Sequence, residues 1–316
     1  MADPPDVAVA VDIGGTKVQA ALVDSRGVVV EGTLTRAPTG RSASSDELDA
    51  AVLGVLAEVM ASGAARTAVG GGHLVGIGVA CAGPVDDVAG RVSPINLPAW
   101  RDHPLLQVIS SAPVVGGIPV TLRRDGVAIA LAEHWLGAGV GVASMMAMVV
   151  STGIGGGILL GGRVVAGNAG HIGQIEVSGH VGEPSLGSRT TLESVASGPH
   201  TVAWARSQGF HGTTGEDLAV AVRAGDPTAA AAVDRLADVV AQGICSACAL
   251  LDLDLVIIGG GFARVTDDLV ARIGRRVATH PLPYVARTRV VPAQLGDAAP
   301  VVGAAAFVHR PDLLPG

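Results

Sequence analysis

Residues 7–18 read Val-Ala-Val-Ala-Val-Asp-Ile-Gly-Gly-Thr-Lys-Val, and this stretch decides the fold. β-Branched residues alternate with alanine at its start, which is typical of a β-strand, and Asp12 lies where that strand ends. The turn Gly14-Gly15-Thr16 permits positive φ and close approach of bare backbone, so N–H groups and a hydroxyl can face a phosphate. We predict a nucleotide-phosphate site here, with residues 23–30 as the hairpin partner of the strand.

Lys17 follows this turn and is the only lysine among 316 residues, the other basic residues being arginine. A flexible point charge therefore occurs at this turn and nowhere else in the chain. The alternative interpretation is a tight hairpin turn that carries a solvated lysine. Asp-Gly-Gly-Thr alone does not distinguish the two.

Composition narrows the class of protein. A chain of 316 residues is long for one hydrophobic core, so we expect two domains around a cleft. Hydrophobic residues make up 49%, which is ample for burial, while the net charge of −7 provides no basic field for nucleic acid. The first six residues are acidic rather than basic and then apolar, which argues against a secretory signal and for a cytoplasmic protein.

Two features that suggest other classes have simpler interpretations. Residues 136–162 carry no charge over 27 residues, yet nine of these are glycine and Ser151-Thr152-Gly153 separates two β-like runs. We therefore predict strands and not a membrane span. Cys245 and Cys248 have C-x-x-C spacing inside an apolar helical stretch, and with Cys81 they are too few for a disulfide framework, so buried small side chains are the better interpretation.

The order of the predicted elements indicates an α/β fold. A helix capped at Ser44, a buried strand at residues 74–80 and another strand at 119–122 follow one another. Ligands in such sheets gather at the carboxyl ends of the strands. Asp125 lies between the last of these strands and a helix at 126–136. It is either a first-turn acid that stabilises the helix by about 1 kcal/mol or a carboxylate placed to take a proton from a hydroxyl.

Three further stretches have the character of ligand-binding loops. Asn96 lies in a loop held by two prolines and can both donate to and accept from a sugar hydroxyl, although such an asparagine is also typical of an Asx-turn. Residues 151–157 form a second glycine turn between apolar strands. Gly259-Gly260-Gly261 follows a third strand, at 253–258, and suits a flat adenine packed against backbone.

Taken together, these motifs resemble the ROK family of bacterial sugar kinases and repressors. The matching segments are D-I-G-G-T-K, G-P-V-D, S-P-I-N-L-P-A-W, R-D-G-V-A-I-A-L-A-E-H-W, S-T-G-I-G-G-G, A-G-N-A-G-H-I-G-Q, L-E-S-V-A-S-G-P and V-I-I-G-G-G, spread from about Val7 to about His309. The resemblance implies an actin-like (ribonuclease H-like) fold of two α/β domains around a cleft. We expect residues 1–117, completed by a C-terminal helix at 300–316, to form one domain and residues 118–299 the other.

The resemblance also implies roles for individual residues, with Asp125 as the catalytic base. Sugar contacts would come from Asn96, Arg124, Asp125, His171, Gln174 and Glu193. ATP and Mg²⁺ would be held by Asp12, Gly14, Gly15, Thr16, Lys17, Thr152, Gly153, Gly259 and Gly260. The partner is then a small sugar-like molecule, and we expect a homodimer because related kinases are often dimers.

The departures from the family pattern concern zinc and the acceptor. Family members usually hold a structural zinc with one histidine and three cysteines. The positions of those ligands are occupied here by Gln174, Pro184, Leu186 and Thr191, so we expect no structural zinc. His171 replaces a glutamate and Arg124 an asparagine that normally touch the sugar. Arg124 either points into the cleft, or faces solvent or pairs with a nearby acid, in which case glucose still fits.

We therefore expect an ATP-dependent kinase that phosphorylates the primary hydroxyl of a hexose, amino sugar or cyclitol, with glucose not the preferred acceptor. The lost zinc ligands suggest a non-catalytic sugar sensor as the alternative. A DNA-binding regulator is disfavoured by the acidic charge. It is also disfavoured because repressor members carry a DNA-binding domain ahead of the first strand, where this sequence has six residues.

Overall fold

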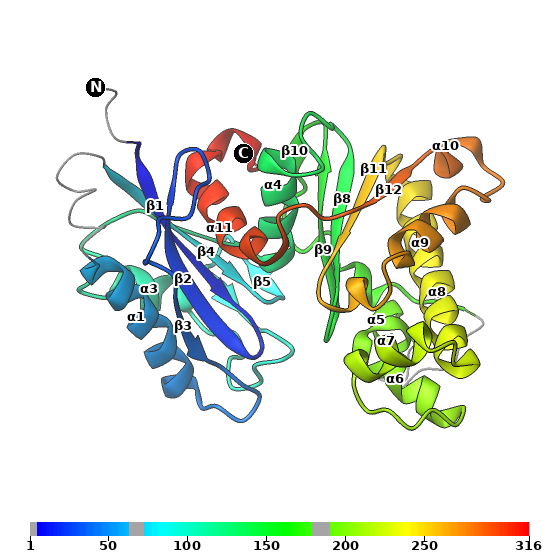
Figure 1. Cartoon of the computed structure of the whole chain (residues 1–316). Coiled ribbons are helices and arrows are strands. Elements are labelled where there is room, and N and C mark those ends of the chain that lie inside the picture. Colours follow the sequence, from blue (N-terminus) through cyan, green and yellow to red (C-terminus); the bar gives the residue numbers. More distant parts are fainter. Residues whose placement is uncertain (1–4, 63–72, 179–189, 316) are drawn as a thin grey trace. The chain divides into compact units, whose positions relative to one another are not determined.

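The computed structural model describes residues 5–62, 73–178 and 190–315, which form two compact α/β units (Figure 1). The first unit comprises residues 1–136, 163–169 and 297–316, and the second comprises residues 137–162 and 170–296. This division differs from the predicted boundary at residues 117 and 118, because the strand and helix that follow residue 118 complete the first unit.

The first unit is built on a five-stranded sheet with the strand order β3-β2-β1-β4-β7. Its strands are β1 Val7–Ile13, β2 Lys17–Asp24, β3 Thr35–Pro38, β4 Leu74–Cys81 and β7 Val120–Arg124. β1 is antiparallel to β2 and parallel to β4, and β4 is parallel to β7. The carboxyl ends of β1, β4 and β7 therefore meet at one edge of the sheet.

The predicted hairpin partner of β1, residues 23–30, is wrong. β1 pairs with β2, from Ile13 opposite Val18 to Val7 opposite Asp24. The Gly14 N–H donates to the Lys17 carbonyl at 2.9 Å, so the glycine turn closes the hairpin at once and the chain re-enters the sheet at Lys17. Within residues 23–30 the structure has an isolated bridge between Val23 and Val29.

Helices cover this sheet. They are α1 Ser45–Ala61, α3 Leu105–Ser110, α4 Asp125–Leu136 and α11 Ala299–His309. The first unit also contains the short η4 Pro311–Leu313, the small sheet of β5 Val85–Asp86 and β6 Arg91–Val92, and the residues of β10 Arg163–Val164. α1 begins with the predicted capping box, in which Ser44 and Glu47 exchange hydrogen bonds. α11 packs on β1, β4 and α4, so closely that a Cβ on Gly303 would collide with the backbone of Ala128.

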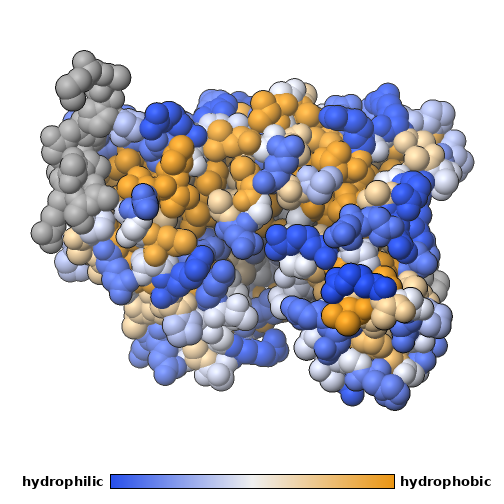
Figure 2. Space-filling model, in the orientation of Figure 1, coloured by the Kyte–Doolittle hydropathy of each residue, from blue (hydrophilic) through white to orange (hydrophobic). Residues whose placement is uncertain are grey.

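The second unit has its own sheet. It is a five-stranded sheet with the strand order β10-β9-β8-β11-β12. Its longer strands are β9 Ile154–Leu160, β8 Met145–Val150, β11 Leu255–Gly259 and β12 Arg289–Pro292. β8 and β9 form an antiparallel hairpin, whereas β8, β11 and β12 are parallel. The uncharged stretch at residues 136–162 therefore contains strands, as predicted. Among the described residues, no helix is long and apolar enough to cross a membrane, and hydrophilic residues are spread over the visible face of both units (Figure 2).

The helices of the second unit are α5 Leu192–Ala196, α6 Gly198–Ser207, α7 Gly215–Arg223, α8 Pro227–Leu251, α9 Leu269–Val277 and α10 Pro283–Ala286; the short η1 Ile172–Gln174 and η2 Phe262–Arg264 accompany them, and η3 Gly296–Ala298 lies at the boundary of the units. The predicted C-x-x-C pair lies on α8. Cys248 is buried there and Cys245 is only half-buried, so within this pair the prediction of buried small side chains holds for Cys248; Cys81 on β4 is buried as well.

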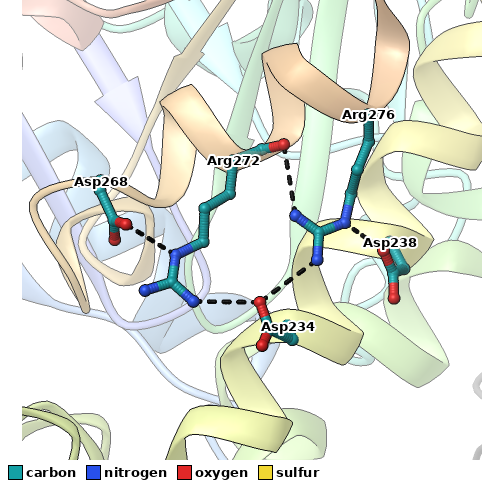
Figure 3. Close-up of polar contacts among 5 residues, drawn as sticks. All are labelled: Asp234, Asp238, Asp268, Arg272 and Arg276. Carbon is teal, nitrogen blue, oxygen red and sulfur yellow. Dashed lines mark hydrogen bonds and ion pairs between the residues drawn. The ribbon is translucent and has the colours of Figure 1, made fainter. Parts of the chain in front are cut away.

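Charged side chains join α8 to α9 (Figure 3). Arg272 contacts Asp234 at 3.0 Å and Asp268 at 2.8 Å. Arg276 contacts Asp234 at 3.2 Å and also pairs with Asp238. The carboxylates are about half exposed, and exposed pairs contribute about 0.2–1 kcal/mol each. The network therefore aligns the two helices more than it stabilises them.

Candidate functional site

Two carboxylates lie at the carboxyl edge of the first sheet. Asp12 is the penultimate residue of β1, and Asp125 directly follows β7 as the first residue of α4. Both side chains retain some exposure, so a ligand can reach them. Gln19 donates to Oδ2 of Asp12 at 3.1 Å, and the backbone N–H of Gly126 donates to Oδ1 of Asp125 at 2.7 Å. The structure therefore brings together two of the predicted site residues that are 113 positions apart in the sequence.

Asp125 affects the ionisation of Asp12. The pKa of Asp12 is raised to about 7, mainly by burial and then by the charge of Asp125, against the opposing effects of Gln19 and Lys17. Burial also raises the pKa of Asp125, while the Arg124 guanidinium and the Gly126 N–H lower it. A pair of half-buried acids with raised pKa values at a sheet edge is typical of a catalytic or cation-binding site.

The first glycine turn lies beside this pair. The backbone N–H of Thr39 donates to the Thr16 carbonyl at 3.0 Å, and the Thr39 hydroxyl donates to the Gly14 carbonyl at 2.8 Å. Thr39, the residue that follows β3, therefore donates hydrogen bonds to two carbonyls of the turn. Lys17 and Thr16 are exposed. An exposed lysine and hydroxyl on a braced glycine turn can meet a phosphate.

Asn96 packs against that turn. A Cβ on Gly15 would lie 2.8 Å from Cβ of Asn96, so the two backbones approach closely and glycine is required. The Asn96 side chain is exposed, and among the described residues its amide group has no hydrogen-bond partner. The Asx-turn interpretation needs such a bond. The amide is thus able to donate to and accept from a ligand next to the phosphate turn.

Arg124 does not face solvent. It is 2% exposed, and its guanidinium donates to the carbonyl of Ala169. Asn168 holds the same segment, because its amide exchanges two hydrogen bonds with the backbone of Val85, at 3.1 and 3.0 Å. Of the orientations considered from the sequence, the solvent-facing one is therefore excluded. The residues before His171 are fixed to the first unit by two side chains.

In the second unit, the predicted glycine turn joins β8 to β9. Ser151 donates to the Gly153 carbonyl at 2.9 Å, and Thr152 is exposed at the tip. Glu193, the second residue of α5, accepts from the Ile154 N–H at 2.8 Å, and a Cβ on Gly153 would lie 2.7 Å from its Oε2. Glu193, which is predicted to contact the sugar, thus lies against the second glycine turn, which is predicted to contact phosphate.

Gln174 lies beside Glu193. Its amide nitrogen is 3.5 Å from Oε1 of Glu193, and Leu192 donates to the carbonyl of the next residue, Ile175, at 2.8 Å. His171 precedes η1 and is half-buried. Thr191, at a family cysteine position, instead caps α5 by accepting from the Ser194 N–H at 3.3 Å.

The other two positions expected to replace zinc ligands, Pro184 and Leu186, lie outside the described residues. Within the described ranges no three His, Cys, Asp or Glu side chains gather as a metal site would need.

A cavity of about 470 Å³ opens next to the second glycine turn. Ser151 and Thr152 line it together with residues that the sequence reasoning missed, from the start of α6, the start of α7 and η2. These are Gly198, Pro199, Val202, Thr213, Thr214, Gly215, Glu216, Ala219, Phe262, Arg264 and Val265, beside the predicted Gly261. The capping box at Thr214 and the Gly-Pro pair at Gly198 mark helix starts in the sequence, but neither indicates which cavity the helix faces.

Gly259 and Gly260 lie at the carboxyl end of β11, just before this cavity. Gly260 has φ of +98°, and a Cβ there would lie 2.5 Å from the Val150 carbonyl. Glycine is required because the turn passes over the end of β8. The third glycine turn thus leads directly into the cavity wall at Gly261 and Phe262.

Comparison with known proteins gives a consistent result. The chain is 29% identical to a glucokinase of Streptomyces coelicolor over 96% of this chain and 98% of that protein. It is 32% identical to an N-acetylmannosamine kinase of Yersinia pseudotuberculosis over 95% of this chain and 97% of that protein. A crystal structure of a ROK family glucokinase from Streptomyces griseus, in complex with glucose and AMPPNP, superimposes with a TM-score of 0.78 at 27% identity, covering 96% of this chain and 99% of that one.

These similarities confirm the predicted two-domain, actin-like α/β fold. The model of the ROK family matches residues 8–311, nearly the whole sequence. The chain therefore belongs to the ROK family.

Proposed function

We propose that this protein is an ATP-dependent kinase that transfers the γ-phosphoryl group to the primary hydroxyl of a hexose or sugar-like substrate. The observation that carries the proposal is the pair Asp12 and Asp125 at the carboxyl edge of the first sheet, next to a braced glycine turn. Full-length similarity to sugar kinases supports the same reaction. The acidic net charge gives no support to a role on nucleic acid.

Asp125 acts as the general base in this proposal. The Gly126 N–H holds Oδ1 at 2.7 Å, which leaves Oδ2 to accept the proton of the acceptor hydroxyl. Arg124 counteracts the rise in pKa that burial causes and so favours the ionised carboxylate that a base requires. Proton removal then coincides with attack on the γ-phosphorus, and positioning of the two substrates supplies most of the rate.

The triphosphate is the ligand of the two glycine turns. Lys17 and Thr16 are exposed on the first turn and Thr152 on the second. The cavity of about 470 Å³ beside Thr152 suits the nucleoside, with the Phe262 ring as an apolar surface and the Thr213–Glu216 segment as the polar wall.

A divalent cation fits the carboxylate pair, because a positive charge would offset the effect of the Asp125 charge on Asp12, and oxygen ligands suit Mg²⁺. Asp12 would hold the ion. When bound, Mg²⁺ neutralises the charge of the phosphate oxygens. Gln19 holds the Asp12 side chain in place, because its amide donates to Oδ2 of Asp12 at 3.1 Å.

The acceptor is a six-membered polyol, and Asn96, Glu193 and Gln174 are the residues we assign to its hydroxyls. The sequence relatives include both a glucokinase and an N-acetylmannosamine kinase. His171 takes the place of a glutamate that touches the sugar in the family, so we propose an amino sugar, a cyclitol or another modified hexose over glucose. A homodimer remains a prediction that light scattering of the purified protein tests.

The test is ADP release by the purified protein with Mg-ATP and a panel of hexoses, amino sugars and cyclitols. We expect release that depends on one class of acceptor and stops when its primary hydroxyl is replaced by hydrogen. The proposal is wrong if no acceptor on the panel raises ADP release above that of buffer with ATP alone.

A further inference from the structure

Asn96 belongs to a loop that is closed at its base. The loop runs from Val92 to His103, and these two residues exchange backbone hydrogen bonds of 2.9 and 3.0 Å. Inside it, Ser93 accepts from the Asp102 N–H at 2.9 Å, and Arg101 donates to the Pro94 carbonyl at 2.9 Å. We call residues 92–103 the acceptor loop. Its internal bonds make it a stiff unit, so its position depends on what holds its base.

The base of the acceptor loop is held by two rings. The Trp100 side chain is fully buried. The His103 ring stacks on it with centroids 4.9 Å apart and planes inclined by 7°. Nε2 of His103 lies 2.8 Å from Oδ1 of Asp49, which is on α1. Nδ1 of the same ring lies 3.4 Å from the hydroxyl of Ser45, one turn earlier on that helix.

Asp49 holds the His103 ring directly and the Trp100 ring through the stack between the two. Burial raises the pKa of the Asp49 carboxyl, and the neighbouring His103 ring opposes this rise. The side chains of His103 and Asp49 are 12% and 23% exposed, so water competes weakly for the contact. One carboxylate of α1 thus holds the His103 ring, and this ring covers the buried Trp100 at the base of the acceptor loop.

The position of this loop matters because of what lies on its other side. Asn96 touches the first glycine turn so closely that only glycine fits at position 15. A shift of the loop base therefore changes the distance between the Asn96 amide and the phosphate turn. Displacements of about 1 Å at a site that aligns two substrates lower the rate or affinity by up to about 100-fold.

We propose that Asp49 and His103 are positioning residues, which hold Asn96 in register with the first glycine turn and thereby set the affinity for the acceptor. This rests on the proposed kinase function and on Asn96 as an acceptor contact. Neither residue touches the acceptor. Both act through the rigid acceptor loop, from the side of the loop that faces α1.

The experiment compares Asp49→Asn, His103→Leu and the double variant with the parent protein, using the best acceptor from the panel. Asp49→Asn keeps the shape of the side chain but removes the charge that faces Nε2 of His103. We expect each single variant, and equally the double variant, to raise KM for the acceptor about tenfold, with kcat and KM for ATP within about threefold of the parent. A purely structural role would instead change stability without this separation of the two KM values.

Two controls sharpen the test. His103→Gln keeps an N–H at the reach of Nε2 and should leave KM for the acceptor within about threefold of the parent value. Asp46→Asn removes an exposed charge from the same first turn of α1, without contact to either ring, and should leave every parameter within about twofold. Should Asp49→Asn unfold below the assay temperature, the contrast between His103→Leu and His103→Gln decides alone.

The inference is overturned if folded Asp49→Asn and His103→Leu proteins keep the parent KM for the acceptor, or if both KM values rise together. Calorimetric titration of the acceptor without ATP separates this inference from the kinase function. If the parent binds an acceptor but transfers no phosphate, the kinase function fails, and weaker binding by Asp49→Asn still supports the positioning role. If the parent binds no acceptor, both fail.

Discussion

Asp12 is predicted to reduce the stability of the protein that it serves. Its pKa is raised from 3.8 to about 7, mainly by burial and then by the charge of Asp125. The native protein therefore binds this proton more tightly than the unfolded chain does. Stability from this group is fully present below pH 4 and is lost as pH rises through 7.

Asp12→Asn removes the ionisation and keeps an oxygen to accept from Gln19. A shift of about three pKa units corresponds to about 4 kcal/mol, and the remaining exposure of Asp12 reduces it. We expect the variant to unfold with a free energy about 2–4 kcal/mol above that of the parent at pH 8, and within about 1 kcal/mol at pH 4. Urea unfolding at both pH values, with Mg²⁺ absent, measures the difference. Phosphoryl transfer should be lost.

Asp24 on β2 is the matched control. It is also buried, which by itself raises its pKa, but the N–H groups of Val28 and Arg26 and the Arg26 guanidinium lower its pKa overall. Its contribution is therefore present above the unfolded pKa and lost as pH falls, so Asp24→Asn should destabilise at pH 8 by about 1–2 kcal/mol. Our reasoning fails if Asp12→Asn is no more stable than the parent at pH 8, or if its gain is the same at pH 4.

Asp125→Asn should lower kcat by about 10² to 10⁴ while the Kd of an ATP analogue stays within about twofold, and parent-like turnover would refute the base assignment. Phe262→Ala, at the edge of the cavity in the second unit, should raise KM for ATP about tenfold and leave KM for the acceptor unchanged; an effect on both would argue against a nucleoside cavity. Chelator-washed protein should contain no stoichiometric zinc and keep its Tm, and zinc whose removal unfolds the protein would contradict this. An amino sugar or cyclitol should exceed glucose in kcat/KM, and a glucose value of about 10⁵ M⁻¹s⁻¹ or more that exceeds all others would show the opposite.

The sequence was most informative where strand, glycine and polar residue follow one another. Asp12, Asp125 and Thr152 were all predicted from such points, and the structure puts the two acids at one sheet edge and Thr152 at the mouth of a cavity. The carboxyl ends of parallel strands meet at one edge of a sheet, so the proximity of Asp12 and Asp125 can be predicted from the local sequence pattern. The predicted hairpin partner of β1 was wrong because the turn at Gly14–Thr16 is short enough for β2 to begin directly at Lys17. No residue in the apolar run after Lys17 marks where that strand begins.

The residues that line the cavity in the second unit could not be predicted from local sequence patterns. Thr213–Glu216, Pro199 and Phe262 come from α7, α6 and η2, and each local sequence indicates only a helix start or a loop. Their convergence depends on how the helices pack on the second sheet. The contact between Asp49 and His103 is of the same kind, since 54 positions separate the two residues and neither belongs to a recognisable motif.

Arg124 shows how packing changes a specificity argument. From the sequence, an arginine in place of the family's asparagine adds up to five donors and a fixed charge to the acceptor pocket. In the structure its guanidinium binds the Ala169 carbonyl and is 2% exposed, so one donor at least is already used within the first unit. The hydrogen bond that Gln174 forms within the protein is weaker, because its amide nitrogen lies 3.5 Å from Oε1 of Glu193. The preference for a modified hexose therefore depends more on Gln174 and His171 than on Arg124, and His171→Glu, which restores the family residue, should move that preference toward glucose more than Arg124→Asn does.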